Sequence, residues 1–106
     1  MDNLTHEMAH CFDFTHGYIS NGIYAIVFKK DLDNMLESAG TSKVTEDFFI
    51  SRQAYLDYVY PENSGHEQAP YAEDFADTVT WFLKHNSEIK SPFIQKTIYL
   101  KELLYN

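Results

Sequence analysis

Apolar side chains recur every three or four residues along most of the chain, which is the spacing of one face of an α-helix. This pattern predicts helices over residues 4–14, about 21–37, 71–84 and about 92–104. Ser20 or Asn21 is the expected N-cap of the second helix, which ends at Gly40. Pro70 and Pro92 are expected in the first turns of the last two helices, where a missing backbone N–H costs little.

The segment 44–60 has a less regular pattern. Phe48 and Tyr55 fit one side of a helix, whereas the apolar run at 48–50 fits a short strand. We expect a helix that is ended by Pro61 and followed by a polar loop. The whole chain, residues 1–106, is therefore expected to form one compact, mainly α-helical bundle with little or no sheet.

The first predicted helix has two chemically different sides. Its apolar side would carry Leu4, Met8, Cys11 and Phe12. The opposite side would carry His6, His10 and Asp13, at positions i, i+4 and i+7. We expect the apolar side to pack in the core and the histidine side to be available for chemistry.

The segment His6-Glu7-Met8-Ala9-His10 has the form His-Glu-x-x-His. Residues four apart lie on the same face of a helix, so the two imidazoles can bind one metal ion. Glu7 stands beside them as a candidate general base. A catalytic zinc ion takes three protein ligands and keeps one position for water, so a third ligand must come from elsewhere in the chain.

Two residues compete for the place of the third ligand. His16 follows His10 by six residues, which is the spacing of a metzincin helix. That pattern, however, has glycine where this chain has Asp13, because the backbone must turn sharply there. Glu73 is the alternative: it stands on the polar side of the predicted helix 71–84, where Asp77 one turn later could orient a ligating imidazole.

Two motifs carry a resemblance to a known family. One is the helix His6-Glu7-Met8-Ala9-His10-Cys11-Phe12-Asp13, and the other is Tyr71-Ala72-Glu73-Asp74-Phe75-Ala76-Asp77. Together they resemble the gluzincin type of zinc metallopeptidase and are most similar to the family that includes the catalytic domain of anthrax lethal factor. The resemblance extends over nearly the whole chain, and these two helical motifs are its specific part.

The resemblance implies a role for each matching residue. The zinc ligands would be His6, His10 and Glu73. Glu7 would be the general base, and the groups that orient the ligands would be Asp13 and Asp77. On this basis we expect Glu73, rather than His16, to be the third ligand.

Two features depart from the family pattern. The family places a tyrosine about seven residues before the ligand glutamate, where its hydroxyl stabilises a developing oxyanion; this chain has His66 there. His66 or Tyr71 would have to donate that hydrogen bond. Family members also carry a small sheet before the motif helix, whereas five residues precede His6. We therefore expect a zincin-like domain without its N-terminal sheet, which a missing N-terminal segment or a partner chain would complete.

Charge and composition narrow the range of partners. The net charge is −8 with eight Lys and Arg, which argues against nucleic-acid binding because phosphate contacts need basic side chains. A single cysteine, Cys11, excludes an internal disulfide. The sequence has no signal peptide and no run long enough to span a membrane, so we expect no membrane partner. A secreted and a cytoplasmic location are both compatible with this pattern.

The sequence thus predicts a zinc-dependent metallopeptidase acting on a peptide or protein substrate. In that reaction Glu7 would take a proton from zinc-activated water and pass it to the leaving amine. Two alternatives stay open: a three-histidine zinc peptidase that uses His16, and a non-catalytic interaction domain derived from a zinc peptidase.

Overall fold

The computed structural model describes residues 3–63 and 70–105, and within these ranges the chain forms helices and no strand. The α-helices are α1 (Asn3–Thr15), α2 (Ile23–Ala39), α3 (Arg52–Val59), α4 (Ala72–Lys84) and α5 (Ile94–Tyr105). Short 3-10 helices are η1 (Ile19–Asn21), η2 (Glu46–Phe48) and η3 (Pro61–Asn63). The radius of gyration is 12.9 Å, close to the ~13 Å of a compact domain of this length. The expected mainly helical, compact fold is therefore confirmed.

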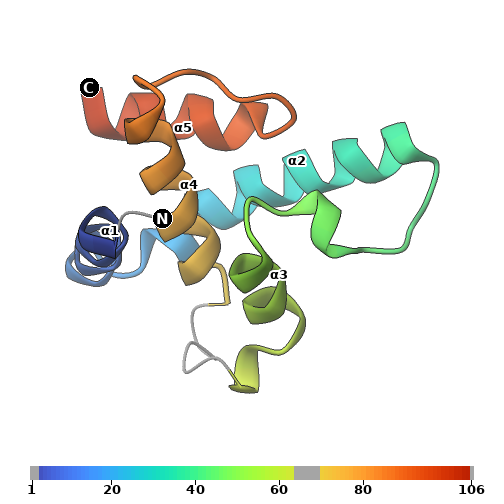
Figure 1. Ribbon diagram of the computed structural model, residues 1–106, viewed down its shortest axis with the longest axis horizontal. Helices are drawn as coiled ribbons and strands as arrows, with labels where there is room; N and C mark the ends of the chain where they lie inside the picture. Colours follow the sequence, from blue (N-terminus) through green and yellow to red (C-terminus); the bar gives the residue numbers. More distant parts are fainter. Residues whose placement is uncertain (1–2, 64–69, 106) are drawn as a thin grey trace.

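Helix α4 lies at the centre of the fold (Figure 1). It packs against α1 on one side and contacts α3 and α5 on others, while α2 packs along α5. Residues 74–80 of α4 are accordingly all buried, polar ones included. Because three other helices meet α4, its carboxylates can reach different partners at different positions along one helix. In the described part of the chain, no helix combines the length and apolar character needed to cross a membrane.

Large aromatic side chains form much of the core. Tyr24, Phe28, Phe75 and Phe82 are each at most 2% exposed. The rings of Tyr24 and Phe75 meet edge to face with centroids 5.1 Å apart, the arrangement that aromatic quadrupoles favour. These contacts join α2 to α4, so they fix the helix that carries Glu73 within the fold.

Two helix N-termini are capped by buried aspartates that belong to other helices. Asp31 of α2 accepts hydrogen bonds from the backbone N–H groups of Gln95 and Lys96, at 2.9 and 2.8 Å, in the first turn of α5. Asp57 of α3 accepts a longer bond of 3.4 Å from the N–H of Glu73, in the first turn of α4. A carboxylate there satisfies donors that have no partner inside the helix and also complements the helix dipole.

Several predicted helix ends need correction. Ser20 and Asn21 lie in η1, and Gly22 is the N-cap of α2 without a side-chain cap bond, so the expected cap is wrong. Pro70 precedes the N-cap of α4, and Pro92 lies two residues before α5, so neither is in a first turn. The end of α2 at Gly40 is confirmed, with φ of 67° in the left-handed region that suits glycine.

The segment 44–60 is only partly helical. It begins without regular structure, forms η2 and then becomes helical as α3, whose N-cap is Ser51. Phe49 is 7% exposed and packs in the aromatic core. Burial of that ring between η2 and α3 outweighs the continuous helical pattern, so the single helix predicted here is wrong.

The orientation of α1 is opposite to that expected from its apolar pattern. Leu4 and Met8 are 71% and 62% exposed, and Cys11 is exposed as well, whereas Asp13 is buried. Of the predicted apolar side, Phe12 is partly buried against the core. The histidine side of α1 faces α4, because polar partners on α4 meet it there.

Candidate metal centre

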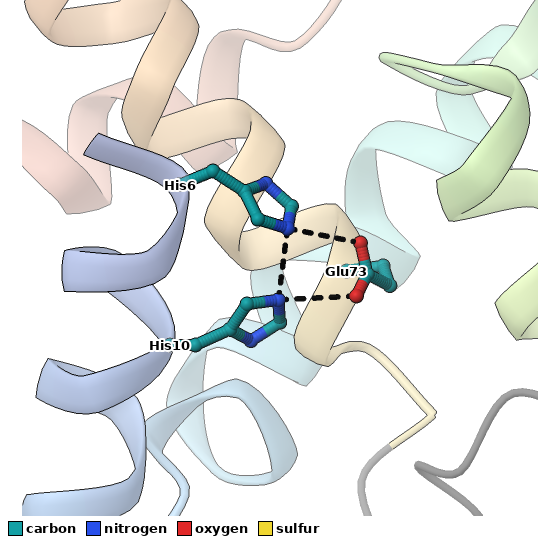
Figure 2. A group of neighbouring side chains, drawn as sticks. All are labelled: His6, His10 and Glu73. Carbon is teal, nitrogen blue, oxygen red and sulfur yellow. Dashed lines mark hydrogen bonds and ion pairs between the residues drawn. The ribbon is translucent and has the colours of Figure 1, made fainter. Parts of the chain in front are cut away.

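Three side chains from two helices converge where α1 packs on the first turn of α4 (Figure 2). His6 and His10 project from successive turns of α1, and Glu73 comes from the second residue of α4. All three are partly buried, with side chains 16%, 20% and 12% exposed. Among the described residues, this group of His, Cys, Asp and Glu side chains could hold a metal ion.

The distances within the group fit one small tetrahedral cation. The Nε2 atoms of His6 and His10 are 3.0 Å apart. Oε1 of Glu73 lies 3.0 Å from Nε2 of His10, and Oε2 lies 3.3 Å from Nε2 of His6. Tetrahedral zinc with bonds of about 2.0–2.2 Å separates its ligand atoms by roughly 3.3–3.5 Å. The spacings among these four atoms, two imidazole nitrogens and two carboxylate oxygens, are therefore within a few tenths of an ångström of that value.

A bound cation could replace the protons that these three contacts otherwise need. Nδ1 of His6 lies 2.8 Å from Oδ1 of Asp77, an ion-pair contact outside hydrogen-bond geometry, and the nearby carboxylate favours a ring proton on Nδ1. In the neutral ring, Nε2 of His6 then carries a lone pair, and that lone pair faces the carboxylate of Glu73. With His6 neutral in this form, a proton on His10 can serve His6 or Glu73 but leaves the contact between His6 and Glu73 without a hydrogen, whereas a doubly protonated His6 would donate to Glu73. A single cation between the two Nε2 atoms and the carboxylate would satisfy these contacts with both rings neutral.

Asp77 connects the centre to α3 as well as to α1. Its Oδ1 faces His6, and its Oδ2 accepts a hydrogen bond from the hydroxyl of Ser51. Burial raises the pKa of Asp77, and the hydrogen bond from Ser51 together with the charge of His6 partly offsets that increase. The position of Asp77, predicted to orient a ligand, is thus beside the Nδ1 atom of His6.

The electrostatics of His10 are set by carboxylates. A hydrogen bond to Glu73 raises the pKa of His10, burial opposes this, and the charges of Glu73 and Glu7 raise the pKa further. Glu7 itself is exposed on α1, next to His6 in the sequence and close enough for its charge to act on His10. A cation that binds here must displace the proton from His10, so its affinity rises with pH.

Asp13 is buried, and it fixes the chain that follows α1. Its two oxygens accept hydrogen bonds from the backbone N–H and the hydroxyl of Ser20, at 2.8 and 2.6 Å. Asp13 also contributes to the raised pKa of His10 through its charge. It therefore lies near the centre, and its hydrogen bonds hold η1 against the end of α1.

Two other predicted site residues, His16 and Tyr71, have contacts away from the three converging side chains. His16 is exposed, its Nδ1 is 2.8 Å from the carbonyl oxygen of Phe12, and its ring stacks on that of Phe12. Tyr71 is the N-cap residue of α4, and its ring packs against those of Phe28 and Tyr58. His66, proposed as an oxyanion donor, lies outside the described residues. The structure thus brings Glu73, and not His16, to the two histidines of the motif.

Sequence reasoning missed two residues that contact the centre, and both come from the segment 51–59. Ser51 donates to Asp77, and Asp57 accepts from the backbone of Glu73. A serine followed by an amphipathic stretch is a helix N-cap signal that could have located Ser51 as the start of α3. No local pattern indicates that α3 packs on α4.

The fold and the centre define a mainly helical protein with a candidate metal site made by His6, His10 and Glu73. Comparison of the chain with protein-family models, with curated proteins and with solved structures finds no match.

Proposed function

We propose that this protein is a zinc-dependent metallopeptidase. The observation that carries the proposal is the convergence of His6, His10 and Glu73, in which each imidazole Nε2 atom lies 3.0–3.3 Å from the other and from a carboxylate oxygen. Two imidazoles and one carboxylate form a donor set that suits zinc, and three protein ligands leave a position for water. The resemblance of the two helical motifs to gluzincin peptidases supports the same assignment.

Zinc bound there would act as a Lewis acid that polarises a peptide carbonyl and lowers the pKa of water. Glu7 is exposed beside His6, where it can accept a proton from the attacking water and deliver it to the leaving amine. Asp77, 2.8 Å from Nδ1 of His6, would favour a proton on that nitrogen and leave Nε2 to act as a ligand. The charges of Glu7 and Glu73 near His10 would further stabilise the cation.

The test separates metal binding from turnover by substituting Glu7. Glu7→Gln keeps the size of an exposed side chain, so the variant should fold and hold about one zinc per chain. Hydrolysis of a fluorogenic peptide library should fall roughly 10²–10⁴-fold, the usual contribution of a general base. His6→Ala is the matched control, in which both zinc and hydrolysis should be lost. Wild-type hydrolysis rates in Glu7→Gln would overturn the mechanism.

A second candidate function is a non-catalytic, zinc-stabilised interaction domain. The outer side of α1 favours it, because Leu4, Met8 and Phe14 are 71%, 62% and 64% exposed. Exposed apolar side chains of this size are typical of surfaces that bind another protein. Such a domain would bind zinc through the same three ligands, yet neither wild type nor Glu7→Gln would hydrolyse the peptide library.

A further inference from the structure

We propose that Ser51 is a positioning residue of the metal centre: by holding Asp77, it fixes the ring of His6 as a ligand. The inference rests on the proposed zinc site and extends it to the N-cap residue of a third helix. Ser51 lies 26 residues before Asp77, at the start of α3. Its hydroxyl bonds to Asp77 and to the backbone of Ala54, so its link to the candidate ligands runs through Asp77.

The hydroxyl of Ser51 has its direction fixed by these two bonds. Its oxygen accepts a hydrogen bond of 3.0 Å from the backbone N–H of Ala54, as the N-cap of α3. Its single proton is donated to Oδ2 of Asp77. A hydroxyl has one donor, so this arrangement commits that proton to the aspartate. The cap of α3 and the orientation of Asp77 therefore depend on the same atom.

Asp77 transmits this constraint to His6. With Oδ2 bound to Ser51, Oδ1 lies 2.8 Å from Nδ1 of His6. Asp77 is 2% exposed, so its oxygens need protein partners: Oδ2 has the hydrogen bond from Ser51, whereas Oδ1 has the ion-pair contact with His6, which is outside hydrogen-bond geometry. A carboxylate that contacts the far nitrogen of a ligating imidazole sets its tautomer and ring orientation, and loss of such a partner typically costs 10–100-fold in metal affinity.

Helix α3 supports the third ligand as well. Asp57 is fully buried and lies five residues after the start of α3. Its carboxylate accepts a hydrogen bond from the backbone N–H of Glu73. Tyr71, the N-cap residue of α4, provides no side-chain cap bond. The same short helix thus contacts both the residue that orients His6 and the backbone of Glu73. This makes α3 the support of the centre on the side opposite α1.

The experiment measures zinc affinity with a competing chelator in wild type, Ser51→Ala, Ser51→Asp and Ser51→Thr. Ser51→Ala should bind zinc about 10–100-fold more weakly. Ser51→Asp keeps a good N-cap but cannot donate to Asp77, so it should lose at least as much affinity. Ser51→Thr keeps both bonds and should restore wild-type affinity. The visible spectrum of the cobalt-loaded protein should change in Ser51→Ala and Ser51→Asp and return in Ser51→Thr.

A matched control separates positioning from general destabilisation. Thr97→Val removes a buried hydroxyl of α5 that bonds to Phe93 and Lys90, away from the centre. Its zinc affinity and cobalt spectrum should equal those of wild type. Zinc affinity in Ser51→Ala within twofold of wild type, or an equal loss in Thr97→Val, would overturn the role of Ser51. Failure of wild type itself to bind zinc would overturn the proposed function along with this inference.

Discussion

Two adjacent residues of helix α4, Glu73 and Asp74, belong to two different polar clusters. The clusters differ in how their charges are balanced. Asp74 points to the interior, where both of its oxygens meet the ammonium of Lys96, at 3.0 and 3.3 Å, and one accepts a bond from the hydroxyl of Tyr24. Glu73 points to α1, where its oxygens face two imidazole nitrogens. Asp74 and Lys96 are each 1% exposed, whereas the side chains around Glu73 are 12–20% exposed.

The difference distinguishes a structural cluster from a ligand site. In the interior, one cation and one carboxylate balance each other, and Lys96 also lies 4.0 Å above the ring of Phe93. Around Glu73, which is partly buried, the carboxylate faces two imidazoles that carry a positive charge only when they are protonated. A buried polar group needs a partner, so a balanced cluster stabilises the fold and an unbalanced, accessible one favours a cation.

Removal of Lys96 should have the largest effect on stability. Lys96→Met leaves the carboxylate of Asp74 buried without its counter-charge, and we expect the free energy of unfolding to fall by about 3–5 kcal/mol. Urea unfolding of the metal-free proteins measures this. Glu73→Gln is the matched control on the same helix and should change the stability of the metal-free chain far less.

The double variant Lys96→Met with Asp74→Asn sharpens the test. It removes both charges, so it should recover part of the stability lost in Lys96→Met. Equal losses of unfolding free energy in Lys96→Met and Glu73→Gln would show that the charges of the two clusters contribute alike to stability.

A smaller loss of stability should appear at alkaline pH, and it should arise from the interior cluster alone. Burial, followed by the nearby charge of Asp74, raises the pKa of Tyr24 well above 10. The folded state therefore keeps a proton that the unfolded state releases above pH 10. The contribution of Tyr24 to stability is fully present below pH 10. It is lost at about 1.4 kcal/mol per pH unit as the pH rises towards the pKa of Tyr24 in the folded state.

Tyr24→Phe lacks this titration and provides the comparison. Its free energy of unfolding, measured by urea denaturation between pH 9 and 11, should decline less steeply than that of wild type. Parallel declines in the two proteins would show that Tyr24 titrates alike in the folded and unfolded states.

Much of the centre could be predicted because its chemistry is local. The spacing of His6 and His10 places both rings on one face of any helix, whatever surrounds that helix. Glu73 required the resemblance of a second motif, since spacing alone left His16 as an alternative. The mainly helical fold followed from apolar periodicity in the same way.

What could not be predicted depends on contacts between helices. The apolar side of α1 was expected inside, yet Leu4 and Met8 are exposed, because the histidine side makes specific polar contacts with α4. Ser51 and Asp57 gave no sign of their roles, since a capping serine and an aspartate are common in helices. Their importance arises only when α3 packs against α4.

The zinc content of the purified protein, loaded with zinc and freed of excess metal, tests the central claim most directly. It should be measured by elemental analysis in wild type, Glu73→Ala and His16→Ala, with folding checked by circular dichroism. We expect about one zinc per chain in wild type and in His16→Ala, and none in Glu73→Ala. A folded wild type without zinc, or loss of zinc in His16→Ala alone, would contradict the site formed by His6, His10 and Glu73.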